Sequence, residues 1–482
     1  MKKSIVFILM MVFTALDAMA HNPQLTLGKM FPAPKEWTGS AWGKDPLEWN
    51  ILDYQHGLVT AYCKDKNRAH FIRFDEEFNI KSSFSAKVLP EAEELSHRIY
   101  DQKIHFILQE HEDIVHLVFD EQSLQLLKQE TLFKMKTTKY AAVEVKYAEH
   151  GDFAAIVVRY LPKKELFDVV ISHDVHLYDM NFQPIANGVF DKVKYPIISF
   201  NKRFAYASAW TVTDDGKVVL ASVKVAEKPK SQPRFGKSGG RMDVAVLSHE
   251  GMRTWFAKDI PWQGLPVGFV GNTTAEDIAK QDKSDPVDMN LKTGTIFDYD
   301  GKQMKLYLMN MIFDYDFDLN EVTPMKRFGQ SLNPPFYTSG ASNYINTKKD
   351  GIIIEEDRGY AWIKPELEES FIGYWGDRDN VTKLFQKRFQ IAEEQFTFYY
   401  QDRYYLVEKI TKFKNWIAME NTFRLRIKSI DKDNKMTETT LDTDLTGKKL
   451  RFFRISDGRY LFWQQFAKQD KQLMQCLGFL EF

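Results

Sequence analysis

The sequence predicts an all-β fold built from many short strands. After residue 45, apolar and polar residues alternate with a period of two, which is typical of strands with one buried face. Long segments with a helical period are scarce. A third observation is a recurring unit, in which an alternating strand is followed by Asp or Ser, a few polar residues and a second strand. Together these features predict a chain of repeated small sheets.

Composition limits the class of protein before any motif is considered. The chain has 482 residues, of which 44% are hydrophobic and 27% charged, so it can fill a core and is not expected to be disordered. The formal net charge of -1 gives no overall basic field, and we therefore expect no nucleic-acid partner. Two cysteines exclude a disulfide-dense scaffold and a zinc site built from several cysteines.

The first twenty residues predict a signal peptide. Lys2 and Lys3 precede an apolar stretch from Ser4 to Leu16, and Ala18-Met19-Ala20 supplies small residues for cleavage before His21. The pattern is typical of bacterial export, which predicts a periplasmic or extracellular, cell-surface protein. The apolar stretch is too short to span a bilayer, and no later segment reaches 18 apolar residues, so no integral membrane span is expected. We expect residues 1-20 to be removed and residues 21-482 to form a single domain.

Turn residues recur along the chain at intervals of about 45 to 70 residues. Asp suits such turns because its carboxylate can accept hydrogen bonds from backbone N–H groups two residues later. The longest interval, from 318 to 431, predicts one further copy without the signature. The turn residues are Asp75, Asp120, Asp179, Ser248, Asp318 and Asp431.

Four short strands in each interval resemble the blades of β-propeller proteins. This resemblance predicts a closed propeller of about seven blades, with six or eight also compatible with the spacing. The tail shows only three strands, Lys448 to Ile455, Arg459 to Phe466 and Gln472 to Phe482, and we expect Gln24 to Phe31 to supply the fourth. The resemblance concerns architecture alone. The chain carries no signature of a particular propeller family, and no functional residues are transferred from one.

The same closure would bring the first and last blades together, and with them Cys63 and Cys476. Two interpretations of these cysteines remain open. They form one long-range disulfide, which an oxidising compartment would favour, or they are two buried thiols that act as small apolar residues.

Three insertions interrupt the blade pattern, near residues 224-241, 272-290 and 376-394. The second opens with a helix-capping pattern at Thr273 to Asp277. The third places Ile391 and Ala392 at near-helical spacing after Val381. We expect one or two short helices in these insertions, and such loops commonly carry function.

Two of the insertions contain candidate ligand-binding residues. Trp375, Asp377 and Arg378 place an aromatic ring beside polar groups, a combination that can stack on a sugar and bond its hydroxyls. The insertion near 224-241 is rich in Lys and Arg. This basic loop could contact an anionic glycan, a lipid headgroup or an envelope protein, although a solvated loop would have the same composition. Its candidate residues are Lys228, Arg234, Lys237 and Arg241.

Metal sites have little support in the sequence. His111 and His116 are spaced by one residue too many for a two-histidine zinc helix, and His173 and His176 would lie on opposite faces of a strand. The remaining pattern is Asp314, Asp316 and Asp318, three alternating carboxylates that could bind calcium. The alternative is that they are solvated acids opposite Lys or Arg on a neighbouring strand. We otherwise expect no cofactor.

These observations favour an exported, non-catalytic binding or scaffold propeller of the bacterial cell envelope with an unidentified ligand. One alternative is a polysaccharide-acting enzyme, with a carboxylate pair drawn from Glu355, Glu356, Asp357, Asp377 and Asp379 at the propeller mouth. Another is an outer-membrane β-barrel, because the chain ends in an aromatic strand at Phe482. Charged residues on both faces of many strands argue against the barrel.

Overall fold

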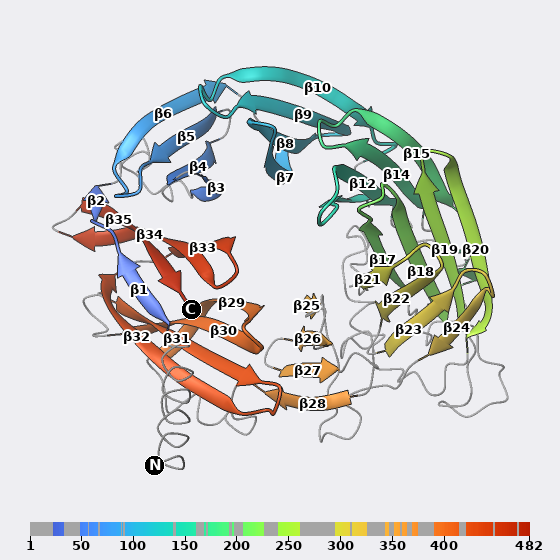
Figure 1. Ribbon diagram of the computed structural model, residues 1–482. Coiled ribbons are helices and arrows are strands. Elements are labelled where there is room, and N and C mark those ends of the chain that lie inside the picture. Colours follow the sequence, from blue (N-terminus) through green and yellow to red (C-terminus); the bar gives the residue numbers. More distant parts are fainter. Residues whose placement is uncertain are drawn as a thin grey trace, which may run out of the picture. The chain divides into compact units, whose positions relative to one another are not determined.

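A computed structural model of the chain describes residues 23-32, 49-55, 57-65, 68-87, 89, 92-137, 141-160, 168-169, 172-191, 195-196, 206-225, 240-260, 295-308, 311-324, 343-346, 351-356, 359-363, 369-374, 390-413, 421-446, 449-469 and 472-482. Within these residues the regular structure is entirely β, in antiparallel sheets (Figure 1). Eight of the sheets described have four strands in their main path, and a ninth has two. The predicted all-β fold of repeated four-stranded propeller sheets is therefore confirmed, and eight sheets fall within the expected range. Closure of the ring and the single domain stay predictions.

The chain divides into two compact units. Unit 1 comprises residues 1-91, 119-126 and 375-482, and unit 2 comprises residues 92-118 and 127-374. The two units are described separately below.

Unit 1 contains the first sheet and the last two sheets of the chain. In spatial order the first sheet is β3 (Asn50–Gln55), β4 (Leu58–Asp65), β5 (Arg68–Phe74) and β6 (Ile80–Lys87). The next is β29 (Gln390–Tyr400), β30 (Arg403–Phe413), β31 (Asn421–Asp431) and β32 (Met436–Thr446). The last is β1 (Gln24–Leu27), β35 (Gln472–Glu481), β34 (Arg459–Gln469) and β33 (Lys449–Ser456), with β2 (Phe31–Pro32) also on β35.

Unit 2 contains the other five four-stranded sheets and the two-stranded sheet. The end of β9 and the first residue of β10 belong to unit 1. The first is β7 (Glu93–Tyr100), β8 (Lys103–Glu110), β9 (Asp113–Asp120) and β10 (Leu126–Lys134). The second is β11 (Ala141–Tyr147), β12 (Phe153–Tyr160), β14 (Ser172–Asp179) and β15 (Pro184–Asp191), and the two-stranded sheet is β13 (Asp168–Val169) with β16 (Tyr195–Pro196). The third is β17 (Tyr206–Val212), β18 (Val218–Val225), β19 (Gly240–Ser248) and β20 (Gly251–Ile260). The fourth is β21 (Thr295–Tyr299), β22 (Gln303–Leu308), β23 (Met311–Asp316) and β24 (Glu321–Pro324). The fifth is β25 (Asn343–Asn346), β26 (Ile352–Glu356), β27 (Gly359–Ile363) and β28 (Glu369–Tyr374).

The N-terminal strand completes the last sheet, as the three-stranded tail predicted. Strand β1 pairs antiparallel with β35, from Gln24 opposite Glu481 to Leu27 opposite Gly478. Buried residues of β3, β4 and β5 form one apolar cluster with Leu461, Trp463 and Leu477 of β34 and β35. The first and last sheets of the chain therefore pack together within unit 1.

The turns between third and fourth strands follow the predicted chemistry. The Asp179 carboxylate accepts hydrogen bonds from the backbone N–H groups of Asn181 and Gln183. Asp75, Asp120 and Asp431 bind the backbone of their own turns in the same way. In the sheet β21–β24 the residue with this role is Asp316 and not Asp318, because β23 ends two residues earlier than the repeat pattern suggested.

Three of these turns also supply an apolar residue to the core. Phe78, Leu124 and Phe182 have positive φ angles, which are costly for a residue with a side chain, and all three side chains are buried. Phe182 packs on Tyr178 of its own sheet and on His116 of the preceding one. Burial of the ring therefore offsets the backbone strain.

The predicted helix near residues 376-394 is wrong at its C-terminal end. Residues 390-394 belong to β29, where Ile391 and Ala392 pair with Thr411 and Ile410 of β30. A register shift between Ala392 and Gln395 interrupts the alternation and explains the misleading spacing. Residues 272-290 and 376-389 lie outside the described residues. In the part of the chain that the structure describes, no helix is long and apolar enough to span a membrane.

Candidate functional site

The predicted ligand-binding residues lie almost entirely outside the described residues. These are Trp375, Asp377 and Arg378 in one segment and Lys228, Arg234 and Lys237 in the other. Arg241 is placed on β19, where its backbone pairs with Lys224 of β18. The assignment of these residues to ligand binding therefore stays a prediction.

The flanking strands nevertheless show where these segments leave their sheets. In unit 2, first and second strands, and third and fourth strands, are joined by short turns such as 213-217 and 249-250. The segments 226-239, 261-294 and 325-342 join second to third strands or successive sheets. In an antiparallel sheet these two kinds of connection leave from the edge opposite the short turns.

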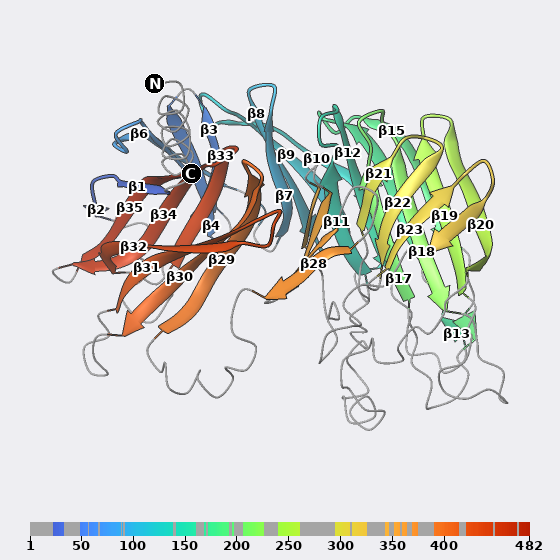
Figure 2. The ribbon, with the colours of Figure 1, turned by 60° about the horizontal axis from the view of Figure 1, so that its bottom comes forward.

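The β13–β16 pair supports this arrangement directly. Strand β13 lies between β12 and β14, β16 lies between β15 and β17, and Val169 pairs with Tyr195. Strand β13 is part of the connection from the second strand of this sheet (β12) to its third (β14), and β16 is part of the connection from this sheet to the next (β15 to β17). The two connections therefore meet beyond one edge of the sheet (Figure 2). We call the edge that carries the long connections the long-connection edge and the opposite one the short-turn edge.

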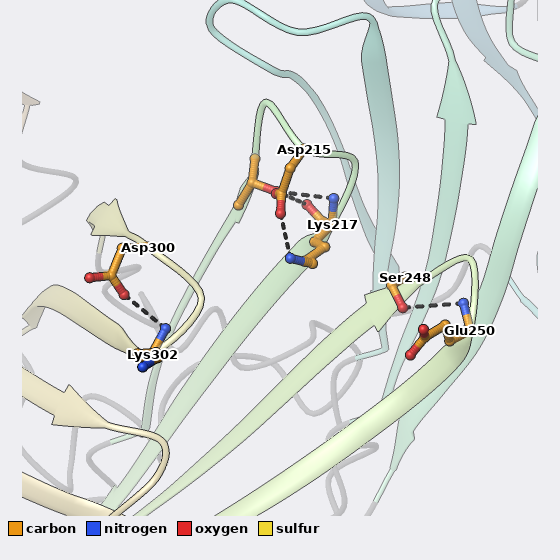
Figure 3. A network of polar contacts seen from close by, with 7 residues as sticks. Asp215, Lys217, Ser248, Glu250, Asp300 and Lys302 are labelled. Atoms are coloured by element: carbon orange, nitrogen blue, oxygen red, sulfur yellow. Dashed lines mark hydrogen bonds and ion pairs between the residues drawn. The ribbon is translucent and has the colours of Figure 1, made fainter.

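Charged residues gather on the short-turn edge of the sheets β17–β20 and β21–β24 (Figure 3). The Asp215 carboxylate forms an ion pair with Lys217 and accepts a hydrogen bond from its ammonium group. This hydrogen bond raises the pKa of Lys217. Asp300 accepts hydrogen bonds from the backbone N–H groups of Gln303 (2.7 Å) and Lys302 (2.8 Å), which lower its pKa. The Ser248 hydroxyl accepts one from the backbone of Glu250. These groups mainly stabilise their own turns.

The three candidate calcium ligands have distinct surroundings. Asp314 lies opposite Lys305 of β22, and burial raises the pKa of its carboxyl group. Asp316 accepts hydrogen bonds from the backbone N–H groups of Leu319 and Asp318, both at 2.9 Å, and the bond from Leu319 contributes most to its lowered pKa. Among the residues described, no group of three or more His, Cys, Asp or Glu side chains is placed to hold a metal ion. Asp314 faces Lys305 but is partly buried and not fully solvated, and calcium binding stays a prediction.

A buried histidine pair was missed by the sequence analysis. His105 Nδ1 of β8 lies 2.9 Å from His116 Nε2 of β9, and His116 Nδ1 lies 3.1 Å from Glu130 Oε1 of β10. Burial, and then the neighbouring His116, lower the pKa of His105 to about 4. Burial also lowers the pKa of His116, although Glu130 opposes this shift. Spacing along one strand relates His116 to His111, but the contact with His105 depends on the register of the β8–β9 hairpin.

Two further histidines lie in the neighbouring sheet. His173 is 2% exposed and lies opposite Arg159, and neither ring nitrogen has a hydrogen-bond partner among the described residues. Burial, and then the charge of Arg159, lower the pKa of His173 to about 3. His176 instead stacks on Phe133, with ring centroids 3.8 Å apart. The two histidines therefore have separate surroundings.

Cys63 and Cys476 are both buried as thiols. Cys63 belongs to the cluster formed with Trp49 and Trp463, whereas Cys476 belongs to a second cluster with Tyr405 and Tyr460. Of the two interpretations left open by the sequence, the structure matches two thiols in apolar surroundings and not a Cys63–Cys476 disulfide. Burial raises the pKa of the Cys476 thiol to about 11.

Of the carboxylate residues of the enzyme alternative, the structure describes only the backbone of Glu355 and Glu356. Glu355 and Glu356 lie at the end of β26, where they pair with Tyr360 and Gly359 of β27. Asp357, Asp377 and Asp379 lie outside the described residues. No observation on these positions favours hydrolysis.

Comparison with known proteins gives similarity of fold only. No protein-family model matches the sequence, and no curated protein sequence matches it. Among solved structures, the chain is similar to prolyl oligopeptidase B from Galerina marginata, with 10% identity, a TM-score of 0.37 and coverage of 78% of this chain and 47% of the other. It is also similar to a prolyl endopeptidase, with 9% identity, a TM-score of 0.33 and coverage of 86% and 53%. A third is the WD40 domain of Toxoplasma gondii coronin, with 8% identity, a TM-score of 0.34 and coverage of 95% and 86%. The chain spans about half the length of the two peptidases, and these values carry no argument about activity.

Proposed function

We propose that the protein is an exported, non-catalytic binding or scaffold propeller of the bacterial cell envelope, and that it binds an anionic glycan through its long-connection edge. One observation carries this proposal. The long segments of unit 2 leave from that edge, while the opposite edge carries short turns whose charged groups bind their own backbone. The basic candidates Lys228, Arg234 and Lys237 fall in one of these long segments.

The chemistry of these residues suits a flexible polyanion. Lys and Arg side chains can each contact a carboxylate or sulfate group, and several weak contacts add up along a repeating polymer. In unit 1, Trp375 with Asp377 and Arg378 offers a separate contact that can stack on a sugar ring and bond hydroxyl groups. The export signal would place the protein among envelope polysaccharides.

The proposal is tested by measuring binding of the mature chain, from His21, to an immobilised sulfated or uronic-acid polysaccharide. A neutral polysaccharide of similar length is the reference surface. The triple variant K228E/R234E/K237E should bind the anionic polymer at least tenfold more weakly, since three favourable charges become repulsive.

A matched triple variant controls for net charge. Lys302, Lys432 and Lys435 are exposed, and all three lie in short turns on the short-turn edge. The variant K302E/K432E/K435E should keep wild-type binding. Equal losses in the two variants would mean that net charge alone causes binding. Absence of binding to any anionic polymer would reject the glycan ligand.

A further inference from the structure

A pair of buried histidines lies where two neighbouring sheets of unit 2 pack together. The apolar cluster at this contact joins Ile107 and Ile114 of β8 and β9 to Ile156 of β12. Phe182, from the turn between β14 and β15, lies with its ring centroid 4.7 Å from that of His116 and 6.2 Å from that of His105. The pair is therefore part of the contact between the sheets.

The hydrogen bonds fix the protonation of both rings. A Glu130 carboxylate can only accept, so His116 donates from Nδ1. The Nε2 atom of a neutral His116 then accepts, and His105 donates to it from Nδ1. This leaves the lone pair of His105 on Nε2, a buried atom without a hydrogen-bond partner in the described part of the chain. An additional proton would bind there.

The surroundings offer this proton little compensation. The Glu130 carboxylate already forms an ion pair with Lys128, with Nζ 2.6 Å from Oε1. The Asp179 carboxylate already accepts hydrogen bonds from the backbone N–H groups of its own turn. Near His105, the opposite charges of Asp101 and Lys103 form an ion pair with each other. Tyr178, whose pKa is strongly raised by burial, stays neutral. Glu130 and the Tyr100 backbone compensate a charged pair only in part, because burial outweighs both, and the charge would lie among apolar side chains.

We propose that the His105–His116 pair is an acid-responsive latch, which holds the sheets β7–β10 and β11–β15 together when neutral and releases them when it takes up a proton. The lowered pKa of His105, about 4, places this event well below neutral pH, and burial lowers the pKa of His116 as well. Release would expose the apolar faces of β8, β9 and β12, and it offers an exported protein a surface that appears only in acid.

Hydrogen exchange of the full chain at pH 7 and pH 4.5 tests the latch, with rates corrected to protection factors. In the wild type, β8, β9 and β12 should lose at least tenfold in protection relative to β30 and β31 of unit 1. The variant His105→Gln, which cannot take up a proton at this position, should lose clearly less protection in these strands than the wild type, and what remains is the part that His173 causes. The control His111→Asn changes an exposed histidine at positive φ, which Asn tolerates, and should behave as the wild type.

A titration of the wild type keeps the test decisive if His105→Gln does not fold. The ring NMR signals of His105 should titrate near pH 4 and those of His116 below the ordinary histidine value, together with the loss of protection. Titration near pH 6.5 without loss of protection would overturn the proposal. Equal loss in His105→Gln and the wild type would also overturn it.

Discussion

Gln465 binds both backbone groups of Trp49, a residue more than four hundred positions earlier in the chain. Its Oε1 accepts a hydrogen bond from the Trp49 backbone N–H (3.1 Å), and its Nε2 donates to the Trp49 carbonyl oxygen (2.7 Å). Both residues are fully buried. Gln465 lies on β34, and Trp49 immediately precedes β3, so this amide connects the last sheet of unit 1 to the first.

Replacement of Gln465 should therefore be costly. Gln465→Met keeps the side-chain volume but leaves two buried backbone groups without these partners, and we expect the free energy of unfolding to fall by about 2–4 kcal/mol. The control is Gln129→Met at an exposed position on β10, which should change it by less than about 0.5 kcal/mol. Urea denaturation followed by circular dichroism measures both. Equal values would show that the amide does not stabilise the contact.

The turn between β7 and β8 has two residues at positive φ, and a substitution there should stabilise the protein. Asp101 and Gln102 join β7 to β8 with φ angles of 49° and 58°. Gln102→Gly should raise the free energy of unfolding by about 1 kcal/mol, because glycine adopts this conformation without a steric penalty. Gln125→Gly, at a turn position that is not among the positive-φ residues, should lower it. A loss of stability in Gln102→Gly would contradict the assigned turn.

The turn that begins at Asp179 allows the contribution of side-chain hydrogen bonds to stability to be measured by changing one side chain. Asp179→Ala removes the acceptor for the backbone N–H groups of Asn181 and Gln183, and we expect a loss of about 1–2 kcal/mol. Asp179→Asn keeps an acceptor oxygen and should recover most of this loss. Equal thermal shifts in the two variants, measured by calorimetry, would show that the carboxylate charge matters more than the hydrogen bonds.

Buried histidines should make folding sensitive to acid. An unfolded histidine binds a proton near pH 6.5, whereas burial lowers the pKa of His173 to about 3, so below pH 6.5 the unfolded chain binds more protons than the folded one. Stability should therefore fall as the pH drops from 6.5 towards 3, with His173 alone contributing about 2 kcal/mol between pH 7 and 5. His173→Leu should remove this part of the dependence. An identical dependence in urea titrations of both proteins would contradict it.

The two thiols should be inert in the folded protein. Cys63 and Cys476 are buried, and the pKa of Cys476 is raised to about 11, so little reactive thiolate forms at pH 8. Mass spectrometry should show no alkylation by iodoacetamide under native conditions and two modified cysteines in urea. A peptide pair that joins Cys63 to Cys476 would instead support the disulfide.

Strand positions in the first sheet could be predicted closely from the sequence. The four short strands expected around the turn residue Asp75 correspond to β3, β4, β5 and β6, because one buried face imposes alternation. The sheet β25–β28 was expected only as a hidden copy. Its strands have four to six residues, and its third and fourth strands are joined by 364-368 without the Asp signature.

The histidine pair could not be predicted in the same way. Spacing along one strand says nothing about which residues of neighbouring strands meet, and that depends on hairpin register. His105 and Glu130 reach His116 from strands on either side of β9. The Asp316 turn was displaced by two residues for a similar reason, since the end of β23 is set by its pairing with β22 and β24.

The pairing of β1 with β35 has a consequence for how the chain is made. A ribosome delivers Gln24 long before its partner Glu481. Until β35 has been made, the hydrogen-bonding groups of β1 have no counterpart in the nascent polypeptide. The sheets before it can assemble as they emerge, but this sheet must await residues 472-481, so a premature stop codon ahead of them would leave β1 and the strands β33 and β34 without their shared neighbour.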